Sequence, residues 1–111
     1  MSTIQALNKM LADLHESLCL AGFAPTKMVL FGSYAKGRSH RDSDIDVAIW
    51  SPKFSGSIAL DMEFLAPVKR NFPLIELHTF YEGDDEASNP FIEEIKKEGK
   101  VWEIDAPLIF R

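Results

Sequence analysis

The sequence predicts an α/β chain in which helices flank a small mixed β-sheet. Two periodicities predict this architecture. Apolar residues near the N-terminus recur every three or four positions, which is typical of an amphipathic helix. Short apolar runs later in the chain are typical of strands, and two of them carry polar residues at alternate positions, Asp44 and Asp46 in one and Glu76 and His78 in the other. The segments follow one another in the order helix, strand, short helix, strand, helix, strand, helix, strand, and such alternation favours helices packed on a sheet.

Three longer helices are predicted from apolar spacing and from residues that start or stop helices. The first ends near Gly22, which suits a C-terminal cap. The second begins at Ile58 and ends before Pro73. The third begins at Asn89-Pro90, because Pro is favoured in the first turn, and it ends at Gly99. The residues expected to face the core from the first and third helices are Ile4, Leu7, Leu11, Leu14, Leu18, Phe91, Ile92 and Ile95.

Four strands are predicted between and after these helices. The first runs from Lys27 to Phe31 and the second from Asp44 to Trp50. The third covers Leu74 to Phe80, and a short fourth covers Val101 to Ile104. A helix of one or two turns is expected to start at Ser33, directly after the first strand.

The composition is that of one soluble globular domain, and residues 1–111 are expected to form it without an internal boundary. The chain is 46% hydrophobic and 26% charged, and its length supports one core but not two. No apolar run approaches the roughly 20 residues that a membrane span requires. The single cysteine, Cys19, cannot form an internal disulfide or a Cys-based zinc site, which favours a cytoplasmic location.

The stretch from Gly32 to Val47, GSYAKGRSHRDSDIDV, carries the most specific pattern in the chain. It places small residues directly after an apolar strand, where a phosphate can approach the backbone. Further on, Ile45 separates Asp44 from Asp46, so strand alternation directs both carboxylates to one face. Residues on one face of a strand lie about 6.6 to 6.8 Å apart, and Mg²⁺ binds oxygen at about 2.1 Å. One ion can therefore lie between the two carboxylates.

Glu76 supplies a third candidate ligand from the third strand. It lies among Leu74, Ile75 and Leu77, and a carboxylate in apolar surroundings is costly unless it binds a cation or a hydrogen-bond donor. We therefore expect Glu76 to complete a metal site with the two aspartates. His78, two residues further along the same strand face, either supports this site or is a structural histidine.

The charge distribution favours a small anionic ligand over a long nucleic acid. The formal net charge of −5 argues against an extended nucleic-acid surface, because such surfaces need many Lys and Arg contacts. Lys36, Arg38 and Arg41 nevertheless form a local basic concentration ahead of the aspartates. Each of the three is a candidate for neutralising a bound triphosphate.

Other phosphate-binding and metal-binding motifs fail on sequence. A Walker-type loop needs Gly-Lys followed by Ser or Thr, whereas Gly37 is followed by Arg38. A calcium loop starting at Asp42 needs Gly at its sixth position and Glu at its twelfth, where this chain has Val47 and Lys53. A Gly-Ser turn or a pair of alternate aspartates has an ordinary structural explanation when it occurs alone. Their combined spacing favours a metal and nucleotide site.

The spacing from Gly32-Ser33 through Gly37 to Asp44 and Asp46 resembles the signature of the polymerase-beta-type nucleotidyltransferase superfamily, in particular its minimal stand-alone members. The resemblance implies a polymerase-beta-like fold that binds ATP or another nucleoside triphosphate with two Mg²⁺ ions. It implies transfer of a nucleoside monophosphate, AMP if the substrate is ATP, to a hydroxyl with release of pyrophosphate. It also implies metal-binding and catalytic roles for Asp44, Asp46 and Glu76, and contacts from Gly32 and Ser33 to the β- and γ-phosphates.

The same resemblance leaves three interpretations of how the chain works with partners. Minimal nucleotidyltransferases often pair with small helical HEPN-type proteins in toxin–antitoxin systems, so the acceptor can be a tyrosine hydroxyl of such a partner. Alternatively, the chain acts as a non-catalytic, antitoxin-like binding module for that partner. A homodimer acting on a small molecule is the third interpretation. The apolar segment 106–110 is expected to pack on the domain or enter an interface.

Overall fold

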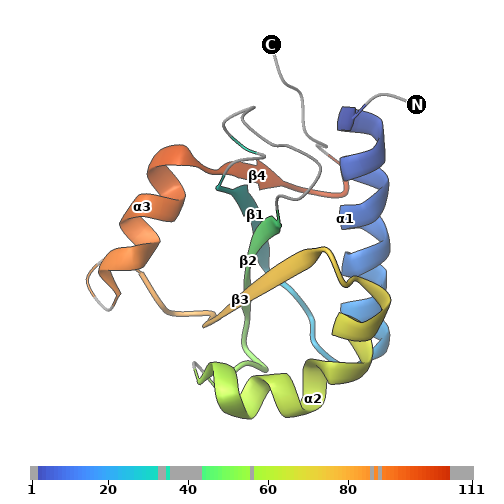
Figure 1. Cartoon of the computed structure of the whole chain (residues 1–111). Helices are drawn as coiled ribbons and strands as arrows, with labels where there is room; N and C mark the ends of the chain where they lie inside the picture. Colours follow the sequence, from blue (N-terminus) through green and yellow to red (C-terminus); the bar gives the residue numbers. More distant parts are fainter. Residues whose placement is uncertain are drawn as a thin grey trace.

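Helices lie on both faces of one mixed sheet, as the sequence predicts (Figure 1). The computed structural model describes residues 3–32, 35, 44–55, 57–85, 87 and 89–105. The predicted short helix from Ser33 and the segment 106–110 lie outside the described residues. The described elements are α1 (Thr3–Leu20), β1 (Lys27–Phe31), β2 (Ile45–Ser51), α2 (Ile58–Asn71), β3 (Ile75–Tyr81), α3 (Pro90–Glu98) and β4 (Lys100–Trp102).

The four described strands have the order β3-β2-β1-β4. β1 is antiparallel to both β2 and β4, whereas β2 and β3 are parallel. A parallel pair needs a crossover connection, and α2 supplies it between β2 and β3. In this register Asp46 pairs with Phe31 on one side and with Glu76 on the other.

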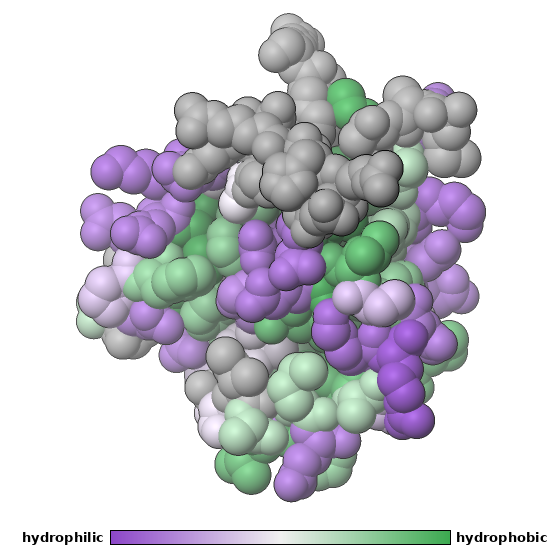
Figure 2. All heavy atoms as spheres, viewed as in Figure 1, coloured by the Kyte–Doolittle hydropathy of each residue, from purple (hydrophilic) through white to green (hydrophobic). Residues whose placement is uncertain are grey.

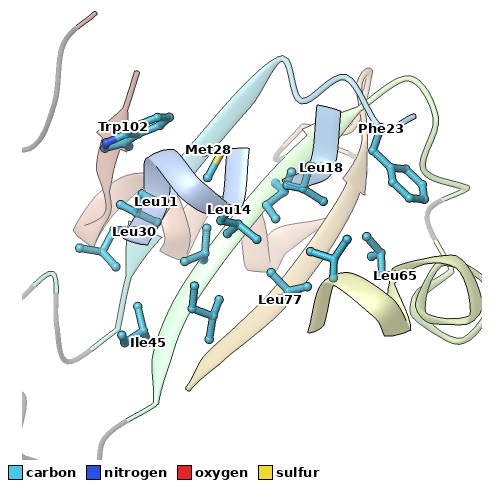
Figure 3. Close-up of a cluster of buried hydrophobic side chains, with 14 of the residues drawn as sticks. Leu11, Leu14, Leu18, Phe23, Met28, Leu30, Ile45, Leu65, Leu77 and Trp102 are labelled. Carbon is cyan, nitrogen blue, oxygen red and sulfur yellow. The ribbon is translucent and has the colours of Figure 1, made fainter. Parts of the chain in front are cut away.

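One face of the sheet is covered by α1 and α2, and it holds the larger core (Figure 3). Leu11, Leu14 and Leu18 of α1 are at most 1% exposed, which confirms the predicted apolar stripe. α2 contributes Leu65 and Val68 to the same cluster. The strand residues that complete this core are Met28, Leu30, Ile45, Val47, Ile49, Ile75, Leu77 and Trp102.

The opposite face is covered by α3, which lies on the other side of the sheet from α1 (Figure 1). Its smaller apolar cluster consists of Val29, Ala48, Trp50, Phe80, Ile92 and Ile95. Asn89 caps the helix by accepting a hydrogen bond from the Phe91 N–H, and Pro90 occupies the first turn as predicted. Phe91, however, is 41% exposed. Its predicted burial is wrong because Ile92 and Ile95 form the buried stripe and Phe91 lies on its flank.

A buried carboxylate joins α2 to the sheet on the first face. Asp61 is 4% exposed and accepts hydrogen bonds from the Ser55 N–H and hydroxyl, each at 2.9 Å, and from the Thr79 hydroxyl at 3.2 Å. These donors compensate the cost of burying the acid. No helix in the described part of the chain has the length and apolar character needed to cross a membrane.

Candidate active site

Asp46 and Glu76 lie side by side on neighbouring parallel strands. They are paired directly in the register between β2 and β3. Their side chains lie on the face of the sheet that α3 covers. Asp46 shares that face with Ala48 and Trp50 of β2, and Glu76 shares it with Phe80 of β3. α3 covers those apolar residues but leaves the acids accessible: the Asp46 side chain is 24% exposed and that of Glu76 is 55% exposed. Figure 2 shows hydrophilic side chains gathered in the middle of the view, over β3.

The His78 side chain lies close to both carboxylates. It lies two residues beyond Glu76 on the same face of β3, and its Nε2 atom is 3.3 Å from Asp46 Oδ1 and 3.9 Å from Glu76 Oε1. One ligand atom from each of the three residues falls within 4.8 Å of the others. The sequence left the role of His78 open, and the structure places it directly at the candidate site.

The exposure of Glu76 corrects one step of the sequence argument. Its neighbours Ile75 and Leu77 are buried, but their side chains lie on the opposite face of β3. The expectation that Glu76 lies in apolar surroundings is therefore wrong. Its proximity to Asp46 comes from strand register, not from a buried environment.

Gly32 lies directly against the Asp46 carboxylate at the end of β1. Its φ of +76° falls in the left-handed region, which glycine adopts without steric cost. A Cβ atom at this position would overlap Asp46 Oδ2. The backbone conformation therefore favours glycine here, and a larger residue would also have to displace the Asp46 carboxylate.

Asp44 is the one remaining predicted site residue that lies within the described part of the chain. Asp44 precedes β2 and is exposed, and the three-residue group that can hold a metal does not include it. Ser33, Lys36, Arg38 and Arg41 lie outside the described residues.

The rings of Phe31, His78 and Phe91 pack together beside the two carboxylates. Phe31 and His78 form a T-shaped contact with a centroid distance of 4.9 Å. Phe91 stacks on His78 at 5.9 Å with an interplanar angle of 19°, and it also contacts Phe31 at 5.8 Å, so each of the three rings touches the other two. Sequence reasoning missed this role of Phe91. The available signal was its position next to the Ile92 and Ile95 stripe, which leaves its ring at the helix edge.

This donor set fits a divalent cation. Two carboxylates and one imidazole are common metal ligands, and carboxylates this close repel each other unless a cation or proton lies between them. Both acids are accessible from solvent, so a phosphate-bearing substrate can reach a cation held there. The arrangement is suited to positioning phosphate oxygens and stabilising their charge.

Comparison with known proteins agrees with this chemistry. The model of the nucleotidyltransferase domain family matches residues 11–107. A search of curated proteins finds no match.

Three solved structures share the fold. A chain from a crystal structure of a toxin–antitoxin with AMP-PNP is 19% identical with a TM-score of 0.58, and the match covers 85% of this chain and 70% of that one. A chain from a mutant of the toxin–antitoxin MntA-HpeT is 17% identical with a TM-score of 0.57 and the same coverage. A protein from Sulfolobus solfataricus, assigned as a nucleotidyltransferase, is 16% identical with a TM-score of 0.58, covering 97% of this chain and 86% of that one.

The family match spans most of the chain, and its fold is the one these structures share. Membership supports nucleotidyl transfer as the general activity. The chain belongs to the nucleotidyltransferase domain family.

Proposed function

We propose that the protein transfers a nucleoside monophosphate, AMP from ATP, to a hydroxyl acceptor in a reaction that depends on Mg²⁺ or a similar ion. The observation that carries this proposal is the in-register pair of Asp46 and Glu76 on the open part of the α3 face. Family membership supplies the reaction class. The accessible carboxylates supply the place where a metal and a triphosphate can meet.

In this proposal Asp44, Asp46 and Glu76 hold two metal ions. When bound, such ions polarise the α-phosphate and stabilise charge on the attacking and leaving oxygens. The acceptor oxygen forms a bond to the α-phosphorus while the bond from that phosphorus to the bridging oxygen breaks, so pyrophosphate leaves. The exposed Glu76 carboxylate takes the proton of the acceptor hydroxyl.

Two sets of residues hold the nucleotide in this proposal. Gly32 and Ser33 bind the β- and γ-phosphates, and Lys36, Arg38 or Arg41 neutralises their charge. The half-exposed ring of Phe91 provides a surface on which a nucleobase can stack. Stacking tolerates different bases because every base has a π-face.

The test is transfer of label from ATP carrying ³²P at the α-phosphate to the proteins and small molecules of a cell lysate. We expect label on one acceptor with the wild-type chain and Mg²⁺, and at most background with Asp46→Asn or Glu76→Gln. Asp13→Asn is the matched control, since Asp13 is an exposed acid on α1 whose partner is Lys9. The proposal fails if no species is labelled, or if the Asp46 variant labels as well as the control.

A second candidate function is that of a binding module for a small helical protein of the HEPN type. Two of the structural neighbours come from toxin–antitoxin complexes. On this chain Leu60 and Phe64 lie one turn apart on α2 and are 56% and 69% exposed, which gives a partner apolar surface to cover. The doubly substituted Asp44→Ala, Asp46→Ala chain separates the two functions: if it still neutralises the partner, binding suffices, and if it binds without neutralising, transfer is required.

A further inference from the structure

We propose that His78 is a direct ligand of the metal ion bound between Asp46 and Glu76, and that the site consequently binds Mn²⁺ more tightly than Mg²⁺. This inference rests on the proposed function, because it concerns the metal used at the same site. It adds a nitrogen ligand and a metal preference to a site otherwise described by its carboxylates.

The donor separations suit a shared ion. An ion about 2.1 Å from each ligand in octahedral geometry has neighbouring ligands about 3.0 Å apart and opposite ligands about 4.2 Å apart. His78 Nε2 is 3.3 Å from Asp46 Oδ1, near the distance between neighbouring ligands, and 3.9 Å from Glu76 Oε1, near the distance between opposite ligands. One ligand atom from each of the three residues lies within 4.8 Å of the others. The half-exposed Glu76 side chain can adjust its position without disturbing the core.

The His78 ring is held in the required orientation. Phe31 contacts the ring in a T-shaped arrangement and Phe91 stacks on it, and the His78 side chain is 21% exposed. The strand backbone directs it to the same face as Glu76. A ligand whose rotamer is already restricted loses little conformational entropy when the metal binds.

The nitrogen determines the metal preference. Mg²⁺ favours oxygen ligands and retains bound water, whereas imidazole is a good ligand for first-row transition ions. A site with two carboxylates and one imidazole therefore gains more affinity for Mn²⁺ than for Mg²⁺. The carboxylates alone still permit Mg²⁺ to bind.

The test measures binding of each metal separately from activity. Isothermal titration of the full chain with MnCl₂ and with MgCl₂ gives the two dissociation constants for the wild type, His78→Gln and His15→Gln. We expect His78→Gln to weaken Mn²⁺ binding by about tenfold or more and Mg²⁺ binding by less than about threefold. His15→Gln is the matched control because His15 lies on α1 and contacts Trp102 in the core of the other face.

Pulsed EPR of the Mn²⁺ complex detects the ligand itself. In protein labelled with ¹⁵N-histidine, we expect ¹⁵N coupling to Mn²⁺ in the wild type and in His15→Gln, and its loss in His78→Gln. Absence of the coupling in the wild type would overturn the inference. Equal weakening of both metals in His78→Gln would also overturn it, since His78 would then only position Asp46 through a hydrogen bond.

The same samples separate this inference from the proposed function. If ¹⁵N coupling is present in the wild type and lost in His78→Gln, but no acceptor is labelled from ATP, His78 is a ligand and the transferase proposal fails. If labelling depends on Asp46 while the wild type shows no ¹⁵N coupling, the transferase proposal stands and the role of His78 as a ligand is wrong.

Discussion

The two faces of the sheet are built from the same strands but serve different purposes. Under α1 and α2, most strand side chains are apolar, and the cluster includes residues such as Leu14 and Leu30 that are fully buried. Under α3, the apolar cluster does not extend to the ends of the strands: it is followed by Asp46 on β2 and by His78 and then Glu76 on β3. We infer that the first face supplies most of the folding free energy, and that the uncovered end of the second face is available for chemistry.

The largest expected effect tests the first half of this comparison. Leu14→Ala should lower the free energy of unfolding by about 2 to 5 kcal/mol, because it removes buried methyl groups and leaves a cavity. Urea denaturation measures the change. Leu20→Ala, on the same helix but 82% exposed at the wild-type position, should change stability by less than about 0.5 kcal/mol. Similar losses from both variants would contradict the assignment of the core to this face.

The next largest effect tests whether the second face, under α3, carries the chemistry. Asp46→Asn should reduce the rate of label transfer by about 100-fold or more, equivalent to about 2.7 kcal/mol of transition-state stabilisation. Its stability should stay within about 1 kcal/mol of the wild type, because the substitution removes repulsion from Glu76 and keeps a hydrogen-bonding side chain near His78. Parallel kinetic and urea measurements check both expectations. A large loss of stability with unchanged transfer would reverse the proposed division between the faces.

A third substitution tests whether Asp61, the buried acid on the first face, has a structural role where Asp46 has a catalytic one. Asp61→Ala should cost about 1 to 3 kcal/mol of stability, because it leaves the Ser55 N–H and the Thr79 hydroxyl without their acceptor. Transfer per folded molecule should be unchanged. Glu63→Ala provides the control, as Glu63 is an exposed acid on the same helix. Loss of transfer in folded Asp61→Ala protein would show that the first face also contributes to the site.

The smallest expected effect concerns Gly32, which follows β1 and lies against the Asp46 carboxylate. Gly32→Ala should lower stability by about 1 to 2 kcal/mol, because alanine is strained at a φ of +76°. It should also reduce transfer, since the new Cβ displaces the Asp46 carboxylate. Gly22→Ala is a matched control: Gly22 has a φ of +92°, but a Cβ there has no neighbour within 4 Å. If both variants lose stability but neither loses transfer, the contact between Gly32 and Asp46 has no functional role.

Local patterns were sufficient to predict most elements of the fold. The apolar stripe of α1, the bounds of β1 and the start of α3 at Asn89-Pro90 are confirmed. These features depend on interactions between residues a few positions apart, such as caps and side-chain periodicity. The same periodicity placed Glu76 and His78 on one face of β3, and the motif spacing identified Asp46. The assignment of Asp44, Asp46 and Glu76 as metal ligands remains a prediction.

The tertiary structure decided how these residues meet. The parallel register that sets Asp46 beside Glu76, the exposure of Glu76, and the packing of Phe91 on His78 depend on which strands pair and how far α3 extends over the sheet. The two acids are 30 positions apart, and no pattern within either segment specifies their alignment. Register follows from the combined burial of both strands against α1, α2 and α3. For this reason the sequence by itself determined the candidate ligands and the faces that carry them, and only the assembled sheet determined that His78 lies among them.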